Sequence, residues 1–521
     1  MDYVGAGVSF RQASVARLAG VTELSVGRWL RIVCAVNLDR ISRVLKRVWA
    51  FSIACDAATH QGLSYFDVRL RITINGFLYN LHLMAIPIHD RHTAEVLFGL
   101  IVKLFDALRS QWRIKLISNS TDGAAVMTGR IRGISTRIRT EVAPGYYQIW
   151  CPLHQIDLVM QKCFEALLNG AFVTMMTGFV AYLRRQQTLI AEMNVTCPFL
   201  IRTRWTCMDT TCQFIFNHRI RLREYVSQPD RVAVASRFAP NDSWWIVVCV
   251  LRAMTSRVAV VVKRMQGRVL LVSQQRDEIQ QLVIVLKELM NVRGPMSDDE
   301  KTVAEADPNT CVMNRWALRS DDVLDFLKDA GTFVTDLFDT LQVSGKMLVI
   351  RSVAECILTM VQGINNVVAE RDANNNIADE LPPVMPHELV KLRGRDMAAI
   401  IVVQRERLQE TFTAQRIDTI ETDHQMLREA YNSDDNLRSA IDACDATTSF
   451  SDGWAIVGPR FPMLREFSGG LATVFPNTAS VESDFSLLKW EKDEYRQSLT
   501  DLSLEGILHS KQWALIEGLD Q

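Results

Sequence analysis

The chain has 521 residues, of which 48% are hydrophobic and 22% are charged, and its formal net charge is -1. At roughly 150 residues per domain, this length predicts about three structural units. The composition excludes a disordered, collagen-like or low-complexity chain, and the balanced charge excludes a global basic excess. Any nucleic-acid-binding surface is therefore expected to be local.

Cysteine usage and the absence of targeting signals predict an intracellular protein. None of the 11 cysteines forms a CxxC pair, and the first residues, MDYVGAGVSFRQ, lack the apolar core of a signal peptide. Two apolar stretches, residues 166–183 and 244–263, approach the length of a membrane span. We expect both to be buried helices, because polar or charged residues interrupt or closely follow them, and we predict no membrane contact.

The first 48 residues carry eight Arg/Lys against three Asp/Glu, with apolar residues at helical spacing. This pattern predicts a basic helical segment. Its charged face either contacts DNA or is solvated while the other face packs on the following domain.

After Trp49 the apolar periodicity changes from helical to alternating. Three runs are predicted to be antiparallel strands: AFSIACD, YFDVRLRITI and FLYNLHLMAI. The dipeptide Asn75-Gly76 separates the second run from the third and is a strong hairpin signal. The second and third strands are therefore expected to be neighbours.

The next 70 residues predict a crossover and two further strands. A helix is expected over 93–111, a fourth strand in RIKLISNSTDG, a basic helix over 124–141 that two glycines weaken, and a fifth strand in YYQIWC. The order βββαβαβ predicts a mixed α/β sheet. Beyond residue 153 the pattern is almost wholly helical to about residue 460, with polar loops near 292–310 and 370–387. A last helix is expected to bury Val481, Phe485 and Leu488.

Acidic residues stand at the ends of two of these strands. Asp56 ends the first strand and Asp122 follows the fourth. A right-handed crossover places the fourth strand parallel to the first, so the two carboxylates are expected to converge. Converging carboxylates suit Mg²⁺ or Mn²⁺, and Glu482 in the first turn of the last helix is the candidate third ligand. The alternative roles are turn formation for the two aspartates and a helix-dipole interaction for Glu482.

A local basic excess lies beside Asp122. Residues 101–140 hold eight Arg/Lys against two Asp, and four of the arginines fall in the predicted helix 124–141, namely Arg130, Arg132, Arg137 and Arg139. In a continuous helix Arg130 and Arg137 share one face, and Arg132 and Arg139 share another. The segment is either a phosphate-binding patch or a solvated helix.

Several ordered segments resemble the hAT transposase superfamily. They are DAATHQGLSYFDVRLRI, STDGAAVMTGRIRG, IWCPLHQIDLV, TRWT and SVESDFSLLK, and the resemblance extends from about Val4 to Trp513. It implies a ribonuclease H-like fold that a large all-α insertion interrupts and that C-terminal helices complete. Other enzyme motifs, such as GxxxxGK[ST], HExxH and GxSxG, are absent from the sequence.

The resemblance also implies roles for individual residues. Asp56, Asp122 and Glu482 match the family's catalytic, metal-binding DDE triad. His154 matches the last residue of its CxxH motif, and the same histidine is equally suited to capping a helix. Trp205 matches the tryptophan of the insertion domain that is associated with DNA hairpin formation. Together with the four arginines, His154 and Trp205 are the predicted DNA-binding residues.

Two departures from the family keep a second function open. Ala58 stands where many active members have a tryptophan two residues after the first Asp, and the spacing of a BED zinc finger is absent. The leading prediction is a Mg²⁺- or Mn²⁺-dependent DNA strand cleavage and transfer enzyme. The alternative is a catalytically inactive, nuclear, DNA-associated or dimerising interaction protein. A third reading is a helical scaffold whose acidic positions are coincidental.

The organisation, partners and location follow from these predictions. Four segments are expected: a basic helical lead-in (1–48), the first part of the core (49–165), the helical insertion (166–465) and the C-terminal core helix with the dimerisation region (466–521). The resemblance implies DNA as a partner, a homodimer or higher oligomer through the C-terminal region, and a nuclear location.

Overall fold

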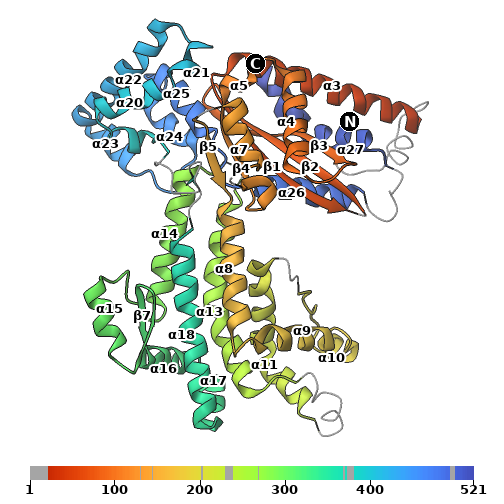
Figure 1. Cartoon of the computed structure of the whole chain (residues 1–521), viewed down its shortest axis with the longest axis vertical. Helices are drawn as coiled ribbons and strands as arrows, with labels where there is room; N and C mark the ends of the chain where they lie inside the picture. Colours follow the sequence, from red (N-terminus) through yellow and green to blue (C-terminus); the bar gives the residue numbers. More distant parts are fainter. Residues whose placement is uncertain are drawn as a thin grey trace. The chain divides into compact units, whose positions relative to one another are not determined.

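The computed structural model describes residues 22–60, 62–129, 131–143, 145–200, 204–228, 239–267, 269–367, 370–371, 381–492 and 499–520. The chain divides into two compact units (Figure 1). The first comprises Met1–Pro152, Gln266–Gln275 and Val368–Gln521, and the second comprises Leu153–Met265 and Arg276–Val367. Residues 368–465 of the segment 166–465 expected for the insertion belong to the first unit.

A mixed sheet forms the centre of the first unit. Its main strands are β1 (Phe51–His60), β2 (Leu63–Ile74), β3 (Phe77–Ile88), β4 (Leu116–Thr121) and β5 (Tyr147–Trp150), in the spatial order β3-β2-β1-β4-β5. The first three strands are antiparallel neighbours, whereas β1, β4 and β5 run parallel. The two-residue strand β8 (Glu370–Arg371) pairs with β5. The predicted mixed α/β architecture is confirmed.

The hairpin between β2 and β3 has the predicted turn. Asn75 and Gly76 both have positive φ, 52° and 78°, and Ile74 lies opposite Phe77. Two central residues with positive φ match the twist of the flanking strands. The hairpin therefore fixes the register of β2 and β3.

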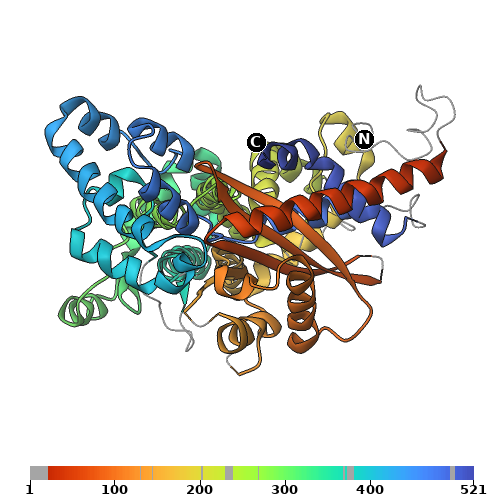
Figure 2. The ribbon, with the colours of Figure 1, turned by 90° about the horizontal axis from the view of Figure 1, so that it is seen from above.

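Alternate residues of the strands face two different helical layers. Phe51, Ile53 and Phe66 pack with helices α3 (Glu23–Arg47) and α4 (Ala94–Leu108). Ala54 and Tyr65 instead pack with α26 (Ala479–Glu491) and α27 (Asp501–Lys511). Figure 2 shows α3 running across the strands, and this helix also contacts α27. The C-terminal helices thus cover one face of a sheet that is built from the first third of the chain.

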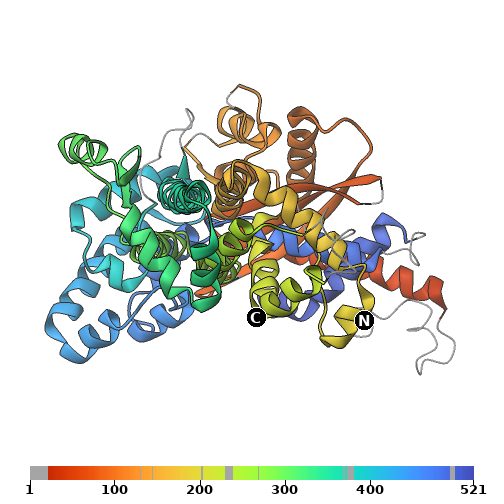
Figure 3. The ribbon, with the colours of Figure 1, turned by 90° about the horizontal axis from the view of Figure 1, so that it is seen from below.

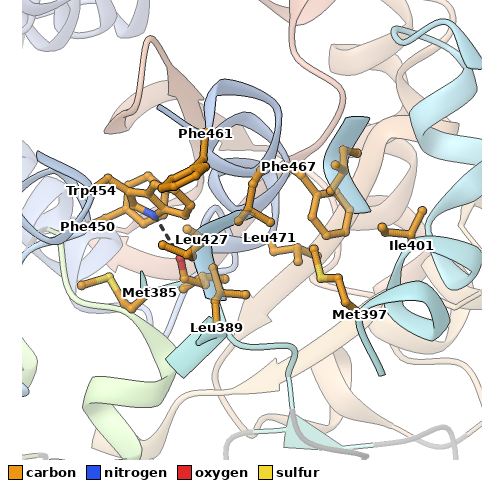
Figure 4. Packing of buried hydrophobic residues seen from close by; sticks show 14 of the residues in the cluster. Met385, Leu389, Met397, Ile401, Leu427, Phe450, Trp454, Phe461, Phe467 and Leu471 are labelled. Carbon is orange, nitrogen blue, oxygen red and sulfur yellow. Dashed lines mark hydrogen bonds between the residues drawn. The ribbon is translucent and has the colours of Figure 1, made fainter. Parts of the chain in front are cut away.

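A helical subdomain completes the first unit (Figure 4). It contains α19 (Pro386–Leu389), α20 (Gly394–Val403), α21 (Arg405–Gln409), α22 (Ala414–Ser433), α23 (Asp435–Asp442), α24 (Phe450–Val457) and α25 (Pro462–Ala472). Trp454 lies in its core and donates a hydrogen bond from Nε1 to the carbonyl of Val384 at 3.0 Å. The ring of Trp49, just before β1, stacks on Phe467 with centroids 5.4 Å apart. This contact joins the subdomain to the sheet.

The second unit consists mainly of long helices, several of which are seen nearly end-on in Figure 3. They include α8 (Pro152–Ala166), α9 (Ala171–Leu183), α11 (Met208–Val226), α13 (Asp242–Met265) and α18 (Val343–Asn365). Residues 310–319, expected to be helical, form a hairpin of β6 (Thr310–Met313) and β7 (Trp316–Arg319). Asn314 allows the turn between them, because its φ is 50° and asparagine tolerates this region.

Two helix predictions were wrong in their continuity. Residues 124–141 form α6 (Ala125–Thr128), α7 (Ile134–Arg137) and a π-helical turn that begins at Ile138. The break lies between Gly129 and Gly133, where a Cβ on Gly133 would be 2.4 Å from the backbone nitrogen of Gly129. The stretch 166–183 also contains a break, because α8 and α9 meet at an angle of 93°.

In the part of the chain that the structure describes, two helices, α13 and α18, are long and apolar enough to cross a membrane by length and composition, and the bent α8–α9 pair would be a third. In α13 the most apolar window is 67% buried within the protein, and in α18 it is 56% buried. Much of their apolar surface is therefore already covered by protein. The absence of membrane contact stays a prediction.

Candidate metal centre

The sheet places Asp56 and Asp122 at adjacent strand ends. Ala54 of β1 lies opposite Ser120 of the parallel strand β4, and each aspartate follows two residues later. Because the strands are parallel, both chains advance in the same direction from this pair. The two side chains are consequently brought to the same edge of the sheet.

Helix α26 contributes the third carboxylate. Asp56 lies on the same sheet face as Ala54, which packs against Val481 and Phe485 of this helix. Glu482 follows the fully buried Val481 in the first turn of α26. All three acidic side chains are partly exposed, so a solvent-borne ion can reach them.

The pKa of the Asp56 carboxyl shows that the three groups influence one another. Burial raises this pKa most, the nearby charge of Asp122 comes next, and the charges of Glu482 and Asp67 add to them, so that the pKa is about 8. A hydrogen bond from the backbone N–H of Ala57 to Asp56 Oδ1, 2.7 Å long, acts in the opposite direction. The site therefore concentrates negative charge that a cation would neutralise.

The loop after β4 is built around a glycine. Asp122 Oδ1 accepts a hydrogen bond from the backbone N–H of Ala124 at 3.1 Å. A Cβ on the intervening Gly123 would lie 2.4 Å from Nε1 of Trp150. Only glycine fits here without displacing the indole ring, so the turn that presents Asp122 depends on it.

Three carboxylates supply the oxygen donors that Mg²⁺ and Mn²⁺ prefer. In the described part of the chain, the oxygens of these three carboxylates do not all lie within 4.8 Å of one another. One ion bound directly by all three carboxylates would require their oxygens to lie closer together. The residue types, three partly exposed carboxylates, are those that hard divalent cations prefer.

His154 and Trp205 belong to the second unit, whereas the three acidic residues belong to the first. His154 is exposed in the first turn of α8. Trp205 is 7% exposed, and its ring lies 6.1 Å from that of Phe164. Their contact with DNA stays a prediction.

Three of the four predicted DNA-binding arginines fall on the broken segment after α6, and Arg130 lies outside the described residues. Arg132 is exposed, Arg137 pairs with Glu141 at 3.4 Å, and Arg139 donates to Gln148 Oε1 at 3.1 Å. The face-sharing expected for a continuous helix does not apply, because the helix is interrupted. The role of these arginines in phosphate binding stays a prediction.

Sequence reasoning missed a buried ionic network beside the acidic site. Its members come from β2, β3, α26 and α27 and are Asp67, Arg69, His82, Asp484, Glu505 and His509, all of them buried. Asp67 lies directly opposite Asp56 in the β1–β2 pair. The strand β2 alternates charged and apolar residues, a pattern that usually marks a solvated face, so this alternation does not indicate that helices cover the face.

The network contains two sets of three potential metal ligands, His82–Glu505–His509 and Asp67–His82–Asp484. Hydrogen bonds already account for the contacts of His82: Nε2 lies 2.8 Å from Glu505 Oε1 and Nδ1 lies 3.0 Å from Asp484 Oδ2. Nδ1 of His509 faces side-chain amide nitrogens of Asn37 and Gln512. Amide nitrogens donate, which places the proton of neutral His509 on Nε2 toward Glu505.

No known protein-family model matches this chain.

Proposed function

We propose that the protein is a metal-dependent DNA strand cleavage and transfer enzyme of the hAT transposase type. The observation that carries this proposal is the convergence of Asp56, Asp122 and Glu482, expressed in the raised pKa of Asp56. Such a set of carboxylates on a mixed sheet is what two-cation phosphoryl transfer needs.

We further propose that the sheet is a ribonuclease H-like core and that the second unit is its helical insertion. The order β3-β2-β1-β4-β5, with β2 antiparallel to its neighbours, supports the first part. The division of the chain supports the insertion, since in the sequence most of the second unit comes after β5 and before the helices that complete the first unit. Glu482 then reaches the sheet through α26.

The chemistry of the site follows from its residues. When bound, Mg²⁺ or Mn²⁺ would activate the attacking oxygen and stabilise the leaving oxygen of a phosphodiester. Asp56, Asp122 and Glu482 would hold the ions, and Asp56 would release its proton as it becomes a ligand. Burial on the α26 side keeps the Asp56 carboxyl partly away from water and strengthens its interaction with charged groups.

DNA as the substrate, a nuclear location and dimerisation through residues 466–521 belong to the same proposal. A folded protein without metal binding would instead favour the catalytically inactive, DNA-associated or dimerising interaction protein. Metal binding separates the two readings before any DNA sequence is known.

The test is Mn²⁺ binding to the full chain, measured by titration calorimetry. We expect binding to the parent and a loss of at least tenfold in affinity for Asp122→Asn, which removes one ligand charge and changes little in volume. The exposed Asp90, in the loop after β3, supplies the matched control. Asp90→Asn should bind Mn²⁺ as the parent does.

Two results would overturn the catalytic proposal. One is the absence of Mn²⁺ binding by a folded parent, and the other is equal binding by the parent and Asp122→Asn. Circular dichroism of each variant confirms that the comparison is made between folded proteins.

A further inference from the structure

Arg69 is a buried arginine of β2 whose side chain reaches helix α26. It is 7% exposed, and its guanidinium donates from Nε to Asn80 Oδ1 at 2.9 Å and from Nη2 to the Asn80 carbonyl at 3.1 Å. These two bonds to β3 fix the plane of the guanidinium. The remaining nitrogen, Nη1, is directed at the helix.

Nη1 of Arg69 contacts residues on both sides of Glu482 in the sequence of α26. The contacted groups are the carboxylate of Asp484, with a distance of 2.5 Å to Oδ2, and the carbonyl of Ser480 at 3.4 Å. These residues stand two positions after and two positions before Glu482 in the first turns of α26. One rigid side chain of the sheet therefore holds the part of the helix that carries the proposed ligand.

His82 reinforces the same contact from β3. Its Nδ1 lies 3.0 Å from Asp484 Oδ2 and 3.2 Å from Asp67 Oδ1, and its Nε2 lies 2.8 Å from Glu505 of α27. The surrounding carboxylates raise the pKa of His82 well above its ordinary value although burial lowers it. The imidazolium and the guanidinium together neutralise Asp484 inside the protein.

The buried face of α26 contains charged residues as well as apolar ones. Val481, Phe485 and Leu488 are buried, but Leu487 is half-buried and Trp490 is 73% exposed. The buried stripe also contains two acidic residues, Asp484 and Glu491, the second paired with Lys511 at 3.3 Å. A buried ion pair adds little stability over an apolar contact of similar volume, but it accepts only one orientation.

We propose that Arg69 is a positioning residue that, through Asp484 and the Ser480 carbonyl, sets the rotation of α26 and so aims Glu482 at Asp56 and Asp122. This inference rests on the proposed metal centre. Groups that orient metal ligands from behind typically change metal affinity by 10- to 100-fold when they are removed.

The test compares two arginines of the same strand. Arg71 is also buried on this face of β2, but it donates to the carbonyls of Leu270 and Val474, which lie outside α26. Arg69→Met is expected to lower the Mn²⁺ affinity of the full chain about tenfold. Arg71→Met should leave the affinity within twofold of the parent, although both variants lose a buried charge.

A double-substitution cycle tests whether Arg69 acts through Glu482. Glu482→Gln is expected to lower Mn²⁺ affinity by itself. Adding Arg69→Met to Glu482→Gln should then cause no further loss, because the positioned ligand is already gone. If Arg69→Met does not fold, Asp484→Asn takes its place in the cycle, since asparagine keeps the shape of the side chain but removes the negative charge that Arg69 and His82 contact.

The outcomes separate the two proposals. Absence of Mn²⁺ binding by the folded parent removes the metal centre itself. If the parent binds and Glu482→Gln binds more weakly, but Arg69→Met and Asp484→Asn bind as the parent does, the metal centre stands and the positioning role of Arg69 is wrong. A fully additive cycle, or an equal loss in Arg71→Met, likewise overturns the positioning role.

Discussion

Replacing Asp56 with asparagine is expected to stabilise the folded protein at pH 8 and to eliminate its binding of Mn²⁺. In the folded protein, burial and the negative charges of Asp122 and Glu482 raise the pKa of Asp56 to about 8. An aspartate in an unfolded chain has a pKa of about 3.9. Between these values the folded state holds a proton that the unfolded state has lost. The contribution of Asp56 to the free energy of unfolding therefore falls by about 1.4 kcal/mol per pH unit across this window.

Asparagine does not titrate, so the free energy of unfolding of the variant does not fall in this way as the pH rises. The difference in the free energy of unfolding between Asp56→Asn and the parent should grow from pH 5 to pH 8 and then level off. Urea unfolding of both proteins at each pH, with a chelator present, measures it. The control Asp90→Asn should show a difference that is small and independent of pH. A flat difference for Asp56→Asn would mean that Asp56 is not held among negative charges.

The sheet and its acidic edge were predictable because their signals are local. The alternation in YFDVRLRITI and the pair Asn75-Gly76 determine strands and a hairpin without reference to the rest of the chain. Asp56 and Asp122 follow their strands directly, and the handedness of crossovers then brings them to one edge. Local signals do not predict the position of Glu482, because its helix is more than 350 residues from Asp122 in the sequence and must return to this face of the sheet.

The helix over 124–141 was predicted as one element because its apolar spacing is helical. Gly129 directly follows α6 and Gly133 directly precedes α7. The two glycines outweigh that spacing, since each Gly costs about 1 kcal/mol relative to Ala within a helix. The close approach of Gly133 to Gly129 is a backbone contact that a periodicity argument does not contain.

The ionic network could not be predicted for a different reason. Asp67 and Arg69 alternate with apolar residues, so each is compatible with a solvated face. Their burial depends on α26 and α27, which come from the last 45 residues of the chain. The sequence shows charged residues in four separate segments, and only the tertiary fold shows that they meet.

The second large effect is expected for Glu505→Ala, which should lower the free energy of unfolding by about 3–5 kcal/mol. Glu505 is buried in α27 and accepts from three groups: Oε1 lies 2.8 Å from His82 Nε2 and 3.2 Å from His509 Nε2, and Oε2 accepts from the Ala85 N–H at 3.0 Å. Removing the carboxylate takes an acceptor from all three buried donors, although His509 Nε2 keeps the carbonyl of Leu83 at 3.3 Å, and it leaves the positive charge of His82 less compensated.

Urea unfolding at pH 7 measures this loss. Glu517→Ala is the matched control, because Glu517 is exposed in α28 (Trp513–Glu517) and its replacement should change stability by less than about 0.5 kcal/mol.

The pH dependence of the Glu505 contribution gives a second check. The neighbouring histidines lower the pKa of Glu505 to about 2 despite its burial, against about 4.3 in an unfolded chain. The stabilisation from Glu505 is therefore fully present above pH 4.3 and is lost as the pH falls toward 2. A difference between parent and Glu505→Ala that persists unchanged at pH 2 would show that the carboxylate is not paired with the histidines, and the network would then stabilise α27 by packing alone.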